Sequence, residues 1–210
     1  MDRTPDKPGL LERDVAAFLG EVGCTAPEAL LDRLRTDHSR ETTPYHSWAH
    51  VLHGLGLLWE YRSAIPECEA VVLAWLNHDR IYDPRGTGNE EKSAELGREM
   101  CLEVGRPDLA DRVHALILDT RHQVEPDTPA GRWIVGIDLA ILGETPERYD
   151  QFEHNIRQEY AHVPKLLYRV GRGRILRGFL ERDRIYDVPE LHERFERQAR
   201  DNLQKAIDAI

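Results

Sequence analysis

The stretch Val71-Val-Leu-Ala-Trp-Leu-Asn-His-Asp79 places a histidine and an aspartate directly after a run that is apolar except for Asn77. Such a run is typical of a helix buried in a core, and we predict that helix over residues 66–78. Residues 80–88 contain Pro84 and two glycines, which end a helix. His78 and Asp79 therefore lie where a buried helix reaches the surface. The side chains of two adjacent residues point about 100° apart in mid-helix, but at a helix end they can bind the same ion.

Helix signals dominate the chain on both sides of this stretch, and no pair of segments alternates as strands do. We predict an all-α fold, a single helical bundle of about eight to ten helices. It forms one domain over residues 9–210, preceded by a flexible tail over residues 1–8. Apolar residues recur at three-to-four spacing in segments 10–20, 46–61, 66–78, 90–104, 107–120, 132–142, 146–162, 165–182 and 189–210.

The composition limits which partners the protein can bind and in which compartment we expect it. The net charge of −10 opposes binding to a nucleic-acid polymer, and no apolar run approaches the roughly 18 residues that span a bilayer. The three cysteines are odd in number and widely spaced, which argues against a disulfide framework. We therefore expect a cytoplasmic protein without nucleic-acid or membrane partners, and the sequence leaves self-association as a homo-oligomer open.

Histidines cluster near the predicted buried helix. His46, His50 and His53 are spaced by four and three residues, so a helix would project all three from one face. Imidazoles that converge in this way suit a transition-metal ion. Taken one at a time, each histidine could instead be a hydrogen-bonded core or surface residue.

Asp138 is the candidate for a further acidic ligand. It lies within the apolar run Trp133-Ile-Val-Gly-Ile-Asp-Leu-Ala-Ile-Leu142, and an unpaired buried carboxylate is costly. A buried aspartate is either paired for structural reasons or bound to a metal. The clustered histidines favour the metal here.

These residues resemble the HD superfamily of metal-dependent phosphohydrolases, whose pattern is a histidine, an HD doublet and a distant aspartate. The resemblance implies an HD-type helical domain in which His50, His78, Asp79 and Asp138 bind the metal. The segment Pro44-Tyr-His-Ser-Trp-Ala-His50 is similar to the Y-H-N-x-x-H motif of cyclic nucleotide phosphodiesterases in the same superfamily. By that likeness His46 is the general acid, and Ser47 departs from the usual asparagine.

A closer resemblance is to a bacterial branch of predicted HD phosphohydrolases, and it extends from residue 43 to about residue 205. This branch has no defined substrate, so the likeness implies a reaction class only. The matching residues are His78-Asp79, Tyr82-Asp83, Asn89–Ala94, Thr120, His122, Asp138–Gly143, Ile156–Tyr160 and Arg174–Tyr186.

The resemblance implies hydrolysis of a phosphate ester of a small molecule, a nucleotide or a related phosphomonoester. The cofactor would be one divalent cation: Mn, Mg, Co, Ni or Fe. We expect His46, Asp79 and Glu90 to be the catalytic residues, with Glu90 orienting water or a histidine. Glu90 could equally complement the dipole in the first turn of its helix, as we expect for Glu91.

Four further residues are candidates for substrate binding. Lys92 and Arg121 could contact a phosphate, although each could also be a solvated surface cation. His122 could contact substrate or bind a second metal, and His53 could line the pocket or merely pack.

Two other functions remain open at this point. Some HD proteins are di-iron oxygenases, which need further histidines after the doublet, and only His114 and His122 are available here. Alternatively, the chain could keep the HD fold as a non-catalytic nucleotide-binding sensor.

Overall fold

The computed structural model describes residues 14–23 and 28–210, so the predicted tail over residues 1–8 lies outside the described part. The described residues form helices joined by loops, with no strand among them, which confirms the all-α prediction. The α-helices are α1 (Val15–Glu21), α2 (Glu28–Asp37), α3 (Trp48–Tyr61), α4 (Cys68–Asn77), α5 (Asn89–Glu103), α6 (Ala110–Asp119), α7 (Pro129–Asp138), α8 (Pro146–Glu159), α9 (Lys165–Leu180) and α10 (Pro189–Ala209). Two short 3₁₀ helices, η2 (Pro107–Leu109) and η3 (Leu139–Gly143), precede α6 and follow α7.

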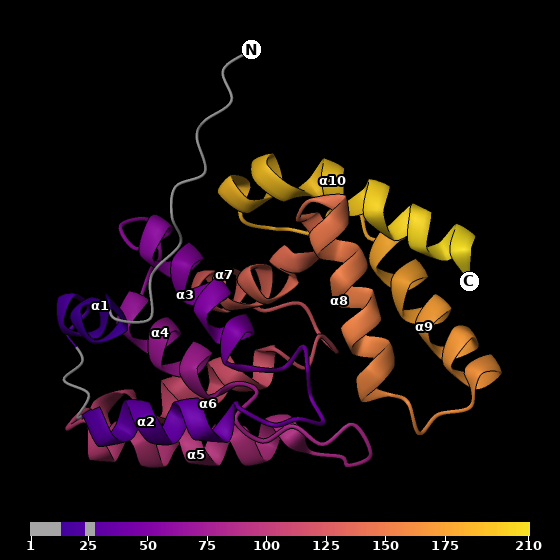
Figure 1. Ribbon diagram of the computed structural model, residues 1–210. Coiled ribbons are helices and arrows are strands. Elements are labelled where there is room, and N and C mark those ends of the chain that lie inside the picture. The colour runs from indigo at the N-terminus through magenta and orange to yellow at the C-terminus, as the bar shows by residue number, and fades with distance from the viewer. Residues whose placement is uncertain (1–13, 24–27) are drawn as a thin grey trace.

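Helix α4 is the centre of the core. Its residues 70–77 are all buried, and it packs against α3, α5, α6 and α7. Figure 1 shows α1 to α6 gathered on one side of the molecule and α8 to α10 on the other, with α7 between them. The predicted helix over 66–78 is therefore present, and it is the helix that the others surround.

The segment predicted as one helix over 132–142 differs in the structure. The α-helix ends at Asp138, and the chain continues as the 3₁₀ helix η3. Two side chains near the C-terminus bind carbonyl groups of this region: Tyr186 Oη donates to Leu139 O at 2.8 Å, and Asn202 Nδ2 donates to Leu142 O at 2.8 Å. These bonds satisfy carbonyls that the change of helix type would otherwise leave unpaired.

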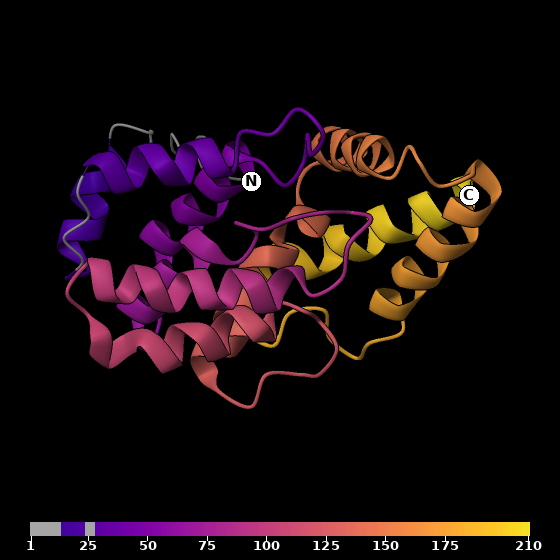
Figure 2. The ribbon, with the colours of Figure 1, turned by 90° about the horizontal axis from the view of Figure 1, so that it is seen from below.

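The C-terminal helices form the second side of the molecule. Helix α10 packs along η3 and against α9, and Figure 2 shows α9 and α10 next to each other. Within the described ranges, no helix is long and apolar enough to cross a bilayer.

Helices α3 and α4 approach closely at Gly54 and Trp75. A Cβ atom at position 54 would lie 2.0 Å from Cζ2 of Trp75, and Trp75 is fixed there because its Nε1 donates to Val51 O at 2.9 Å. Its ring also stacks on His78, with 4.2 Å between the ring centroids. Glycine is thus required for packing at this position, and the tryptophan links the core to the histidine of the doublet.

We expect Gly54→Ala to lower the free energy of unfolding by about 1–3 kcal/mol, because the added methyl overpacks the helix contact. The matched control is Gly178→Ala in α9, where no atom lies within 4 Å of the new Cβ. There alanine should stabilise by about 0.5–1 kcal/mol through its better helix propensity. Urea unfolding followed by circular dichroism measures both, and equal effects would contradict the packing argument.

Candidate metal centre and adjoining cavity

Three helices bring the candidate ligands together. His50 lies in the first turn of α3, His78 directly follows α4, and Asp138 is the last residue of α7. One ring nitrogen from each histidine and one oxygen of Asp138 lie within 4.8 Å of one another, and the three residues could hold a metal ion. Asp79 joins them from its place next to His78.

The distances between the candidate ligand atoms are short. His50 Nε2 lies 3.2 Å from His78 Nε2, 3.4 Å from Asp138 Oδ1 and 3.5 Å from Asp79 Oδ2. His78 Nε2 lies 3.0 Å from Asp79 Oδ2 and 3.7 Å from Asp138 Oδ1. Ligand atoms about 2.0–2.2 Å from a tetrahedral or octahedral ion would be separated by about 2.9–3.5 Å, so these residues fit a metal.

The chemistry of the four atoms also fits a cation. Nδ1 of His78 lies 2.8 Å from the carbonyl oxygen of Trp75, which can only accept, so Nδ1 carries a proton. When the ring is neutral, Nε2 of His78 therefore carries a lone pair, and this lone pair faces the carboxylate oxygens and Nε2 of His50. Electron-rich atoms at these distances repel one another unless a proton or a metal cation lies between them.

The pKa shifts of His78 and His50 also favour a site that binds a cation. Burial acts to lower the pKa of His78, but the carboxylates of Asp79 and Asp138 outweigh it and raise the pKa well above its usual value. Burial lowers the pKa of His50, which favours the neutral ring that a metal requires. The site thus attracts positive charge while it keeps one imidazole as a base.

His46 lies beside this group and is held by a residue that sequence reasoning missed. Glu159, the buried last residue of α8, accepts the backbone N–H groups of Tyr45 and His46 at 2.8 and 3.0 Å. Its other oxygen lies 2.7 Å from Nδ1 of His46, and the His46 ring stacks on Tyr82 with 3.6 Å between centroids. The other ring nitrogen, Nε2, is then the one that can exchange a proton with a bound molecule.

Charge around His46 favours its protonated form. Burial acts to lower its pKa, but the carboxylates of Asp79 and Glu159 outweigh burial, with a further contribution from Asp138, and the pKa lies above its usual value. An imidazolium at this position can donate a proton near neutral pH.

His122 has a strained backbone that places it against the candidate ligands. Its φ of 56° is in the left-handed region, which costs a residue other than glycine about 1–2 kcal/mol. Its Nε2 lies 2.8 Å from Oδ2 of Asp138, whose other oxygen faces the two histidines. Strain that persists at such a contact points to a functional role.

A cavity of about 360 Å³ adjoins this group. Asp138, His46 and His122 line one part of it, and the rest is lined by residues of η3, α8 and α9 together with Tyr45, Tyr82, Tyr160 and Val163. A second cavity, of about 160 Å³, also includes His122 in its lining, and there Arg132, Arg182 and Arg184 are accompanied by Glu125 and Asp187. His122 therefore borders both cavities.

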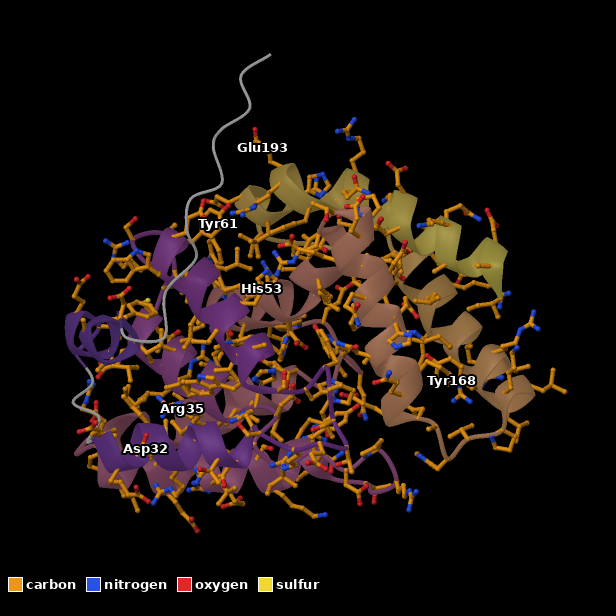
Figure 3. The ribbon with its side chains drawn as sticks, in the orientation of Figure 1. Asp32, Arg35, His53, Tyr61, Tyr168 and Glu193 are labelled. Carbon is orange, nitrogen blue, oxygen red and sulfur yellow. The ribbon has the colours of Figure 1, made fainter. Side chains whose placement is uncertain are left out.

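The other predicted site residues lie elsewhere. Nε2 of His53 contacts Glu144 Oε1 at 2.9 Å, and Figure 3 shows His53 on α3. Lys92 Nζ donates to Thr87 O at 3.3 Å, and Arg121 pairs with Glu91 at 3.0 Å.

Glu90 lies half-buried in the first turn of α5. Glu90, Lys92, Arg121 and His53 are not among the residues that line either cavity. The structure does not place these four residues at the candidate site, and their roles remain predictions.

No family model matches the chain, and neither curated proteins nor solved structures gave a match. A helical fold with a histidine-histidine-aspartate group is consistent with an HD-type domain. The likeness rests on these residues and on their geometry.

We expect a divalent ion at about 100 times its Kd to raise Tm by about 5–10 °C, since binding then adds about 2.7 kcal/mol of stability. Asp138→Asn should remove most of this shift, because it replaces one charged ligand by an amide. The matched control is Asp150→Asn, an exposed residue that pairs with Lys205 at 2.8 Å. The measurement is Tm with and without Mn²⁺. If Mn²⁺ raised the Tm of Asp138→Asn as much as that of the wild type, the ion would bind elsewhere.

Proposed function

We propose that the chain is a metal-dependent phosphohydrolase that cleaves a phosphate ester of a small molecule, a nucleotide or a related phosphomonoester. One observation carries the proposal: two imidazoles and two carboxylates converge beside the His46–Glu159 pair, at a cavity large enough for a small molecule. A divalent ion held by His50, His78, Asp79 and Asp138 would polarise a phosphoryl oxygen and lower the pKa of a bound water.

The chain's own residues supply the rest of the chemistry. His46, protonated at Nε2 and held at Nδ1 by Glu159, would give its proton to the oxygen of the departing alcohol. Glu159 acts as a positioning residue, because it orients the ring and stabilises the imidazolium without touching the substrate. His122 borders the cavity and contacts Asp138 through Nε2, so it would act as a positioning residue for that ligand.

The di-iron oxygenase draws its support from His122, whose contact with Asp138 could extend to a second ion. His114, the other histidine available for such a site, instead contacts Glu95 of α5 at 3.2 Å. Elemental analysis separates the two functions: two irons per chain together with oxygen consumption would replace the hydrolase proposal. Binding of a phosphate ester by metal-loaded protein without phosphate release would favour the sensor.

We expect His46→Gln to lower phosphate release by about 10²–10⁴-fold, the usual contribution of a general acid, while the metal content stays at the wild-type level. Inductively coupled plasma analysis and a phosphate-release assay measure the two quantities on the same preparation. Loss of the metal together with the activity would show that His46 is a ligand and not the acid.

Glu159→Gln tests how the proton donor is held. A general acid works while it is protonated, so activity falls as the pH rises through the pKa of His46. Because the Glu159 carboxylate helps to raise that pKa, the amide should move the alkaline limb of the pH–rate profile to lower pH. An alkaline limb at the wild-type pH would contradict the role of Glu159.

A further inference from the structure

The large cavity has a composition that restricts what can enter it. Its lining includes six aromatic residues: Tyr45, Tyr82, Phe152, Tyr160, Tyr168 and Phe179. Aliphatic residues of η3, α8 and α9 complete the apolar walls. Figure 3 shows Tyr168 where α9 faces α8, and Arg157 of α8 lies over its ring at 4.6 Å.

The only arginine or lysine that lines this cavity in the described part of the chain is already paired. Arg172 donates two hydrogen bonds to Glu153, at 2.7 and 3.1 Å, and its guanidinium lies 5.2 Å from the ring centre of Phe152. A bidentate pair of this kind neutralises the arginine. The cavity therefore offers no unpaired positive charge to a second phosphate or to a carboxylate.

Two apolar side chains of the cavity wall are exposed to water. Leu167 is 63% exposed and Ile175 is 51% exposed, although both line the cavity. They lie two helical turns apart on the same face of α9. An apolar group bound in the cavity would cover this surface, and the gain would come from the hydrophobic effect.

The polar end of the cavity lies at the metal centre. His46, His122 and Asp138 line it, so a phosphoryl group held there would direct the rest of its molecule toward the aromatic and aliphatic walls. The proton of His46 is then available to the ester oxygen that joins the two parts.

We propose that this cavity receives the leaving group of the substrate, and that this leaving group is an uncharged alcohol with an aromatic or aliphatic body. The inference rests on the proposed function and narrows it to phosphomonoesters of apolar alcohols. Substrates with a second phosphate are excluded by the missing countercharge. Hydrolysis breaks the ester bond between phosphorus and the alcohol oxygen, and water supplies the new oxygen on phosphorus. The alcohol leaves with the proton from His46, and the proton that the water loses is released to solvent, from which His46 is protonated again.

The test compares two esters of primary alcohols, 2-phenylethyl phosphate and glycerol 1-phosphate, on the Mn²⁺-loaded full chain. We expect kcat/KM to be at least about tenfold higher for the phenylethyl ester, as apolar contacts of this size provide. Ile175→Asp should lower this ratio at least about tenfold. The matched control is Val170→Asp on the same helix, because Val170 is 60% exposed and does not line the cavity; it should keep the wild-type ratio.

A binding measurement separates this inference from the proposed reaction. Calorimetry should show that 2-phenylethylphosphonate binds at least about tenfold more tightly than methylphosphonate, and that Ile175→Asp removes the difference. If the phenylethyl preference in binding is present while neither ester is hydrolysed, the cavity assignment stands and the hydrolase proposal falls. If both esters are hydrolysed equally and both phosphonates bind equally, the cavity assignment is overturned and the hydrolase stands. Faster hydrolysis of a bisphosphate would also overturn it, and would direct attention to the arginine-lined second cavity.

Discussion

The structure depends on the convergence of two imidazole nitrogens and two carboxylate oxygens from the ends of helices that otherwise form the core. The two carboxylate oxygens lie 3.0–3.7 Å from the two histidine nitrogens, and their negative charge attracts a proton or a metal cation to this point. Helices α3, α4 and α7 meet at this point, and α4 is buried along almost its whole length. The same packing that stabilises the core therefore brings the candidate ligands together.

The sequence predicted the helical class and the end of the buried helix at the doublet, because an apolar run followed by proline and glycine indicates where such a helix ends. It also placed the doublet at the surface, whereas His78 is buried. The likeness to the Y-H-N-x-x-H motif selected His50 from three histidines that were expected on one helix. That expectation was wrong for His46, because α3 begins at Trp48. The structure separates those three by their partners: His50 faces His78, His46 contacts Glu159, and His53 contacts Glu144. Spacing along one helix could not show this, because the partners come from distant helices.

Glu159 shows most clearly what the sequence could not predict. It lies 113 residues from His46, and a glutamate near the end of an amphipathic helix is ordinarily solvated. Glu159 lies in Ile156–Tyr160, one of the segments on which the resemblance to predicted HD phosphohydrolases rests, but that resemblance assigned it no role. Lys92 and Arg121 illustrate the opposite case: their charge suggested phosphate contacts, whereas the folded chain gives them Thr87 and Glu91 as partners.

The candidate metal ligands and much of the cavity wall come from different parts of the chain, and this separation has an evolutionary consequence. All four candidate metal ligands lie between residues 50 and 138, whereas α8 and α9, which form much of the cavity wall, come later in the chain. Substitutions in α9 can therefore reshape the wall without altering any ligand or the helices that present them. A family built on this plan could diversify the molecules it accepts while its inorganic chemistry stays constant. The part of α9 most open to such change is residues 165–173, which precede the Arg174–Tyr186 segment on which the family resemblance rests.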